Sequence, residues 1–169
     1  MSIPVIIDDS LTGKLTRSKV YQDYQSAFES ATGLPLHLHE AGRAADGLSS
    51  RPSGNPFCLL LAKSNQTCAA CFALQQELEQ QAGMEPRSLH CFAGLCESAI
   101  PVRVGDKIIA FLQTGQILLH RPDAKQFSKV AQTLIEMGTE IDMKKAEDAW
   151  FATTVLKESQ YQSMLRLLQ

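Results

Sequence analysis

Apolar side chains recur along the chain with two periods, which predict both helices and strands. Residues 17–32 carry apolar positions at helical spacing, and a glycine and a proline follow as stop signals. The next residues, 34–39, alternate strictly, so we expect a strand with leucines on one face and His37 and His39 on the other. The glycine- and serine-rich stretch 40–54 predicts a loop.

The centre of the chain predicts two helices followed by antiparallel strands. An Asn-Pro pair is a natural start for the first of these helices. Helices are expected over residues 57–62 and 66–82, and strands over residues 88–92, 97–104 and 107–119. Gly105 and Asp106 lie between the last two strands and predict a tight hairpin turn.

The last third of the chain is helical in pattern. Asp123 and Gln126 form the signature of a capping box ahead of an apolar stripe that Gly138 closes. That stripe consists of Phe127, Val130, Ala131, Leu134 and Ile135. We expect Asp142 to cap a short helix that runs through Ala149. The final stripe consists of Tyr161, Met164, Leu165 and Leu168, and no stop signal follows it, so we expect the sequence to be a fragment of a longer chain.

This order of elements predicts the α+β class, with helices covering an antiparallel sheet. We expect an N-terminal extension over residues 1–16, one domain over 17–140, and a helical connector over 141–169. The 169 residues carry a net charge of −2 and no dense basic cluster, which argues against direct nucleic-acid binding. No secretory leader or membrane-length apolar run occurs in the sequence, so we expect a cytoplasmic protein with no membrane partner.

Several short motifs resemble the PocR family of sensory domains. They are Phe57-Cys58, the Cys68 to Cys71 pair, His90 to Leu95, Ala99 to Val102, and Gly115 to Ile117. The similar region spans roughly residues 17–137, and residues 160–168 resemble the connector that such regulators place before an AraC-type output module. The resemblance implies a PAS-like sensor fold. It also implies the sensory part of an AraC-family bacterial transcriptional regulator, which binds a small effector such as a diol or a hydrocarbon-derived compound. Signal transduction would run through the C-terminal helix, and DNA would be bound only through an output domain absent from this sequence.

The five cysteines leave three explanations open. Cys58, Cys68, Cys71 and Cys91 could meet as four thiolate ligands for zinc or an iron–sulfur cluster, and the PocR resemblance supports this because matching positions often carry cysteine. They could instead be small buried hydrophobic residues. In the third explanation, residues 57–62 form a strand, and the C-x-x-C pair becomes a thioredoxin-like redox site with Pro101 nearby.

No motif for catalysis or phosphate binding occurs, so we expect a receptor and not an enzyme. A receptor needs a cavity between sheet and helices that is mostly apolar with a few polar anchors. The candidate ligand-binding residues are His90, Phe92, Ile109, Phe111, Gln113 and Gln116, although ordinary core or surface roles stay open for each. His37 and His39 could chelate a metal, but a polar strand face is the favoured interpretation. The final helical stripe either docks on the sheet or pairs with a second copy, and we expect a homodimer through it.

Overall fold

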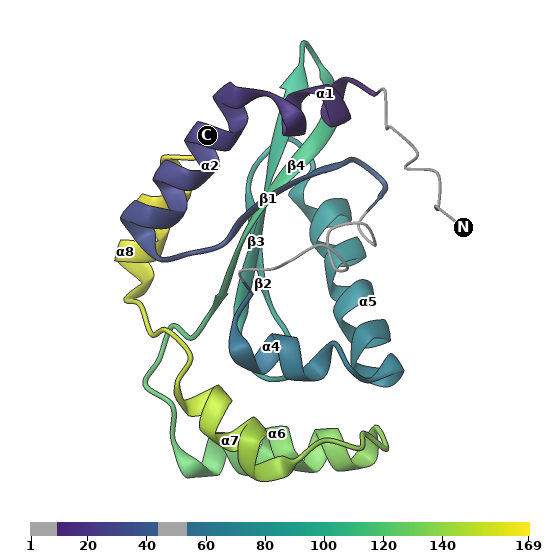
Figure 1. The fold of residues 1–169 in the computed structure, drawn as a ribbon, viewed down its shortest axis with the longest axis vertical. Helices are drawn as coiled ribbons and strands as arrows, with labels where there is room; N and C mark the ends of the chain where they lie inside the picture. The colour runs from purple at the N-terminus through teal and green to yellow at the C-terminus, as the bar shows by residue number, and fades with distance from the viewer. Residues whose placement is uncertain (1–9, 44–53) are drawn as a thin grey trace, which may run out of the picture.

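The structure is a computed structural model that describes residues 10–43 and 54–169. Within these residues its centre is a four-stranded antiparallel sheet with the strand order β1-β4-β3-β2 (Figure 1). The strands are β1 (Leu36–Glu40), β2 (Arg87–His90), β3 (Cys96–Val104) and β4 (Lys107–Ile117). Helices pack on both faces of this sheet, which confirms the predicted α+β, PAS-like class.

Except for the first, which lies mainly in the expected N-terminal extension, the described helices agree closely with the sequence pattern. They are α1 (Leu11–Arg17), α2 (Lys19–Thr32), α4 (Pro56–Leu61), α5 (Asn65–Ala82), α6 (Ala124–Glu136), α7 (Met143–Phe151) and α8 (Glu158–Arg166). Ser18 caps α2 through the Tyr21 amide, and Gly33 ends it in the left-handed region with φ 71°. The predicted capping box of Asp123 and Gln126 forms at the start of α6. Local start and stop signals therefore explain where these helices begin and end.

Three expectations need correction or fall outside the described residues. Residues 57–62 lie mainly in helix α4, and every paired strand in the described ranges is antiparallel, so the strand that a thioredoxin-like site requires is wrong. Ile135 points away from the core and is 68% exposed, so it is not part of the buried stripe of α6. The predicted loop over residues 40–54 lies mostly outside the described residues.

The register of the strands separates the sheet into two faces. His37 and His39 pair with Gln113 and Phe111, which places all four side chains on the face that α5 covers. Leu36 and its neighbours on the opposite face pack against α2 and α8 in the main hydrophobic core. Figure 1 shows α2 and α8 on one side of the sheet and α5 on the other.

The C-terminal helix α8 docks on the sheet, which is one of the two alternatives predicted for its stripe. Tyr161, Leu165 and Leu168 are buried, and Met164 packs against the same core. Homodimerisation stays a prediction. In the described part of the chain, no helix is both long and apolar enough to cross a bilayer.

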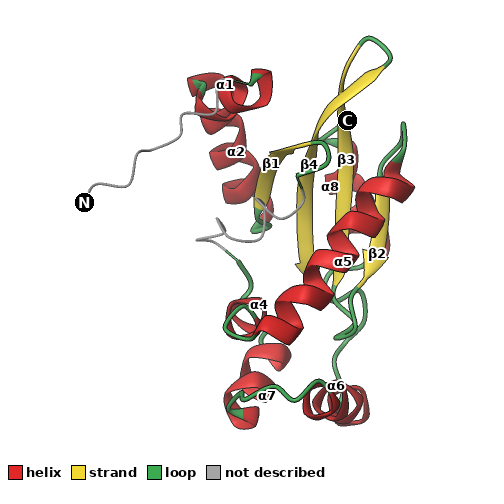
Figure 2. Ribbon diagram, turned by 90° about the vertical axis from the view of Figure 1, so that its right-hand side faces the viewer, coloured by secondary structure: helices red, strands yellow, loops and turns green. Residues whose placement is uncertain are grey.

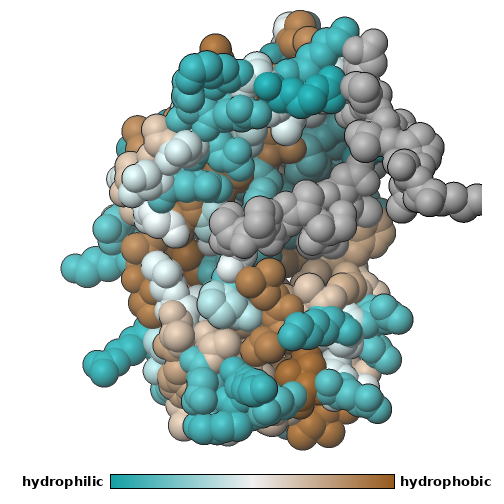
Figure 3. Space-filling view, viewed as in Figure 1, coloured by the Kyte–Doolittle hydropathy of each residue, from teal (hydrophilic) through white to brown (hydrophobic). Residues whose placement is uncertain are grey.

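A second hydrophobic cluster holds α4, α6 and α7 together below the sheet (Figure 2). Its centre is Trp150, whose ring contacts Phe127 with 5.5 Å between ring centroids. The indole nitrogen of Trp150 donates a hydrogen bond to the Ala93 carbonyl over 2.9 Å, which fixes α7 to the turn after β2. Apolar side chains also reach the surface around α4 and α7 (Figure 3), among them Leu59 and Phe151.

Candidate ligand-binding site

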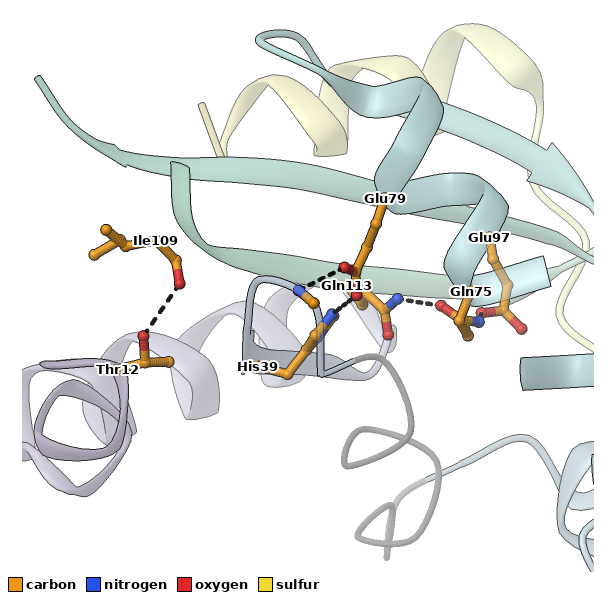
Figure 4. A network of polar contacts seen from close by, with 8 residues as sticks. Thr12, His39, Gln75, Glu79, Glu97, Ile109 and Gln113 are labelled. Carbon is orange, nitrogen blue, oxygen red and sulfur yellow. Dashed lines mark hydrogen bonds and ion pairs between the residues drawn. The ribbon is translucent and has the colours of Figure 1, made fainter. Parts of the chain in front are cut away.

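Buried polar side chains gather between α5 and the sheet. His39 Nε2 on β1 lies 2.7 Å from Glu79 Oε1 on α5, and only 3% of the histidine side chain is exposed (Figure 4). The second carboxylate oxygen of Glu79 accepts a hydrogen bond from the Gly42 amide over 3.0 Å. This carboxylate therefore joins α5 to both β1 and the turn that follows it.

A second chain of polar contacts crosses from β4 to β3 through the same helix (Figure 4). The Gln113 amide donates to Gln75 Oε1, and the Gln75 amide donates to Glu97 Oε2. All three side chains are buried, and Gln75 has no exposed surface. The carboxylate of Glu97 can only accept a hydrogen bond, so the Gln75 side chain donates to it through its NH₂ group. The Gln75 side-chain oxygen is then left to accept from the NH₂ group of Gln113.

Apolar side chains of α5 and the sheet pack beside these polar groups. Leu78 and Ala82 of α5 pack on Ala99 and Phe111 of the sheet. Polar groups in such a layer are costly to bury unless each finds a partner. An apolar wall with a few converging polar groups is the composition of a small-molecule site. This arrangement makes the α5 face of the sheet the candidate ligand-binding site.

The structure separates the predicted ligand-binding residues into four places. Phe111 and Gln113 lie in the α5 layer. Ile109 is farther along the same strand, where its carbonyl accepts hydrogen bonds from the Ala41 amide and the Thr12 hydroxyl. Gln116 lines a hollow at the end of β4. His90 and Phe92 line another hollow near α6 and α7.

The sequence pattern does not predict the polar partners on α5, although one signal is present. Gln75 shares the helix face of Leu78 and Ala82, and a polar residue on an otherwise apolar stripe is the kind of position that marks a buried contact. The pattern around Glu97 is that of an ordinary polar strand residue, yet this residue is only 8% exposed. Nothing local in the sequence pairs Gln75 with Glu97, because the two residues are brought together by the tertiary fold.

Gln116 occupies a bulge in β4 and has a positive φ of 57°, which is rare for a residue with a side chain. Its Oε1 accepts a hydrogen bond from the Asn55 amide over 2.7 Å. The side-chain nitrogen of Asn55 donates to the Gln116 carbonyl over 3.1 Å and to the Thr153 hydroxyl over 3.0 Å. These bonds join the start of α4, the bulge and the segment before α8 around a hollow of about 190 Å³.

On the opposite face, directly behind Glu97, the sheet is bonded to α8. The hydroxyl of Tyr161 lies 2.7 Å from Ser98 Oγ, which in turn lies 2.6 Å from Ser88 Oγ. Burial raises the pKa of Tyr161 above its ordinary value, so the phenol stays neutral and can donate. Because Glu97 and Ser98 are consecutive residues of β3, their side chains lie on opposite faces of the sheet.

The five cysteines are not joined in disulfide pairs, and they differ in environment. Cys58 and Cys91 pack against the cluster around Trp150, whereas the Cys68 thiol donates to the Ala62 carbonyl over 3.4 Å. Burial raises the pKa of Cys91 to about 11 and that of Cys96 to about 12. Across residues 10–43 and 54–169, no three His, Cys, Asp or Glu side chains gather in an arrangement that could hold a metal ion. The metal site of four cysteines stays a prediction, which a measurement of bound metal can test.

Comparison with known proteins gives one family. The family whose description is "Sensory domain found in PocR" matches residues 14–169. No curated protein and no solved structure matches the chain significantly. The matched range includes α8 as well as the sheet and the helices that cover it.

Proposed function

Because the chain belongs to the PocR sensory domain family, we propose that it is the ligand-binding sensory part of a bacterial transcriptional regulator, with no catalytic role of its own. The observation that carries this proposal is the buried polar layer beneath α5, where Gln113, Gln75 and Glu97 are joined in a chain beside Phe111. We assign the effector to this layer.

The chemistry of the layer favours a small molecule with hydroxyl groups and a short carbon skeleton. A hydroxyl can donate to a carboxylate such as Glu97 and accept from an amide such as that of Gln75. It can therefore insert into the polar chain without leaving a buried group unpaired, which would cost about 1–3 kcal/mol. Leu78 and Phe111 offer the apolar contact that a carbon skeleton needs. A diol fits both requirements.

The proposed output is a change in the position or stability of α8. An effector that moves Glu97 also moves Ser98, which holds the Tyr161 hydroxyl of α8. Two arrangements of α8 would then differ in effector affinity, and the shift between them is limited to the difference in binding free energy, typically about 1–3 kcal/mol. The proposal further includes a cytoplasmic location, a homodimer, and DNA binding through an AraC-type output domain.

Calorimetric titration with a panel of two- to four-carbon diols tests the effector class. We expect at least one diol to bind, and Gln75→Leu to weaken it by about tenfold, the equivalent of one lost hydrogen bond. Gln113→Leu should act in the same direction and provides a second variant if Gln75→Leu is poorly folded. Gln132→Leu is the matched control because Gln132 is exposed on α6 and bonded only to Glu136 among the described contacts. Equal diol affinity in all four proteins would contradict the proposed site.

A further inference from the structure

The hollow lined by His90 and Phe92 lies at the far end of the sheet from the turn of the β3–β4 hairpin, and the proposed effector site does not use it. It has a volume of about 200 Å³ and opens between the turn after β2, the end of β4, and helices α6 and α7. Its apolar floor is formed by Phe92, Val130 and Trp150. Its polar rim is formed by His90, His120 and Lys129.

The floor of this hollow is held in place by residues 90–95, the turn that follows β2. Gly94 adopts a positive φ of 78° and donates to the Cys91 carbonyl over 2.9 Å, which closes the turn. Trp150, only 2% exposed, donates its indole N–H to the Ala93 carbonyl over 2.9 Å. The aromatic wall is therefore fixed by a hydrogen bond and by burial before any ligand arrives.

The rim of the hollow has basic character. Lys129 is a cation, His90 and His120 carry imidazole rings that can donate a hydrogen bond, and none of the residues that line the hollow is acidic. Arg121 adds a further cation in the segment between His120 and Lys129, whereas Lys125 of the same segment does not line the hollow. The one carboxylate in that segment, Asp123, accepts a hydrogen bond from the Gln126 amide as the cap of α6. A basic rim above an aromatic floor complements an anion with an apolar body.

We propose that this hollow binds a small organic carboxylate, with the carboxylate at Lys129 and His120 and the apolar body against Phe92 and Trp150. The site adjoins Leu118, whose amide donates to the Thr154 carbonyl over 2.9 Å and whose carbonyl accepts from the Leu156 amide over 3.0 Å. Those bonds hold the segment that leads into α8. A bound carboxylate would thus lie beside the residue that holds this segment.

Trp150 is the single tryptophan of the chain and lines this hollow, so a change in its fluorescence during titration is read from a residue of the proposed site. The test titrates the protein with cyclohexanecarboxylate, which does not absorb where tryptophan is excited, and with cyclohexylmethanol as the uncharged control of the same shape. We expect a saturable fluorescence change with the carboxylate and a much weaker one with the alcohol. Affinity should fall as salt is added, because the ion contacts are partly exposed.

Two lysine variants separate a site from general charge attraction. Lys129→Gln should weaken cyclohexanecarboxylate binding by about 1.4-fold to fivefold, the usual range for one exposed ion pair. Lys125→Gln removes the same charge from the same helix outside the hollow and should leave binding within error of the wild type. Gln75→Leu should also leave it unchanged, which distinguishes this site from the effector site. Equal binding of acid and alcohol, equal effects of the two lysine variants, or no saturable response at tens of millimolar would each overturn the proposal.

Discussion

Gly115 lies where β4, β3 and α8 approach most closely, and its replacement by alanine tests how tight this contact is. A Cβ atom at this position would lie 2.5 Å from the Cys96 carbonyl oxygen, 2.7 Å from Glu97 Cα and 3.1 Å from the Tyr161 hydroxyl. The residue also has a φ of 132°, which side chains rarely allow. Since the first two contacts are with backbone, they cannot be relieved by a side-chain rotation.

The cost follows from these two effects. The unfavourable backbone conformation contributes about 1 kcal/mol. Inserting a methyl group into the packed contact adds about 1–3 kcal/mol. We therefore expect Gly115→Ala to reduce the free energy of unfolding by about 3 kcal/mol, a large share of the roughly 5–15 kcal/mol typical of a domain. The loss should appear as a lower urea midpoint, followed by Trp150 fluorescence and far-ultraviolet circular dichroism.

Gly33→Ala is the matched control for this prediction. Gly33 also has a positive φ, 71°, but a Cβ atom added to it would meet no atom of the surrounding fold within 4 Å. Its replacement should therefore cost only the backbone strain, about 1 kcal/mol. Surface substitutions typically change stability by less than about 0.5 kcal/mol. If the two variants differ by no more than this, the inference that α8 packs closely behind Glu97 is wrong.

Three further predictions concern the groups around this contact. Tyr161→Phe should lower the free energy of unfolding by about 1 kcal/mol and speed hydrogen exchange in α8, because it removes the hydrogen bond to Ser98. Tyr24→Phe is the control and should have little effect, because it removes only a solvent-exposed hydrogen bond from α2. The free energy of unfolding should fall as pH rises from about 9 toward 11. Burial raises the pKa values of Cys91 and Cys96 in the folded protein, so these thiols lose their protons at lower pH in the unfolded chain than in the folded one. Cys96→Ala should make this decrease with pH shallower in urea titrations repeated at each pH. In thiol titration of the native protein, Cys96, 1% exposed, should react slowest. Four blocked thiols with one bound metal would instead support the predicted site of Cys58, Cys68, Cys71 and Cys91.

The parts of the fold that depend on local signals are predictable from the sequence. Asp123 and Gln126 lie three residues apart, so the start of α6 can be located from the sequence alone. The alternation of leucine and histidine in residues 34–39 likewise indicates the two faces of β1. The pattern does not predict helix α1, because Leu11, Thr12 and Gly13 form no amphipathic stripe and the helix is held mainly by its Ser10 cap and tertiary packing.

The candidate site is only half predictable, because its contacts join distant parts of the chain. Phe111 and Gln113 can be chosen as inward strand residues, but their partner Gln75 lies 38 residues from Gln113 on a helix. The bulge at Gln116 decides that this residue leaves the α5 layer, and a glutamine carries no sequence signal for a positive φ. His90 and Phe92 lie apart from the other candidates because the position of the turn after β2 relative to α5 is set by tertiary packing.

The most direct test of the proposed function is the crystal structure of this chain with the diol from the panel that binds most tightly. We expect the diol between α5 and the sheet, with its hydroxyl groups within hydrogen-bond distance of Gln75, Gln113 or Glu97 and its carbon chain against Phe111. A diol bound only elsewhere, with the hydrogen bonds from Gln113 through Gln75 to Glu97 unchanged, would contradict it.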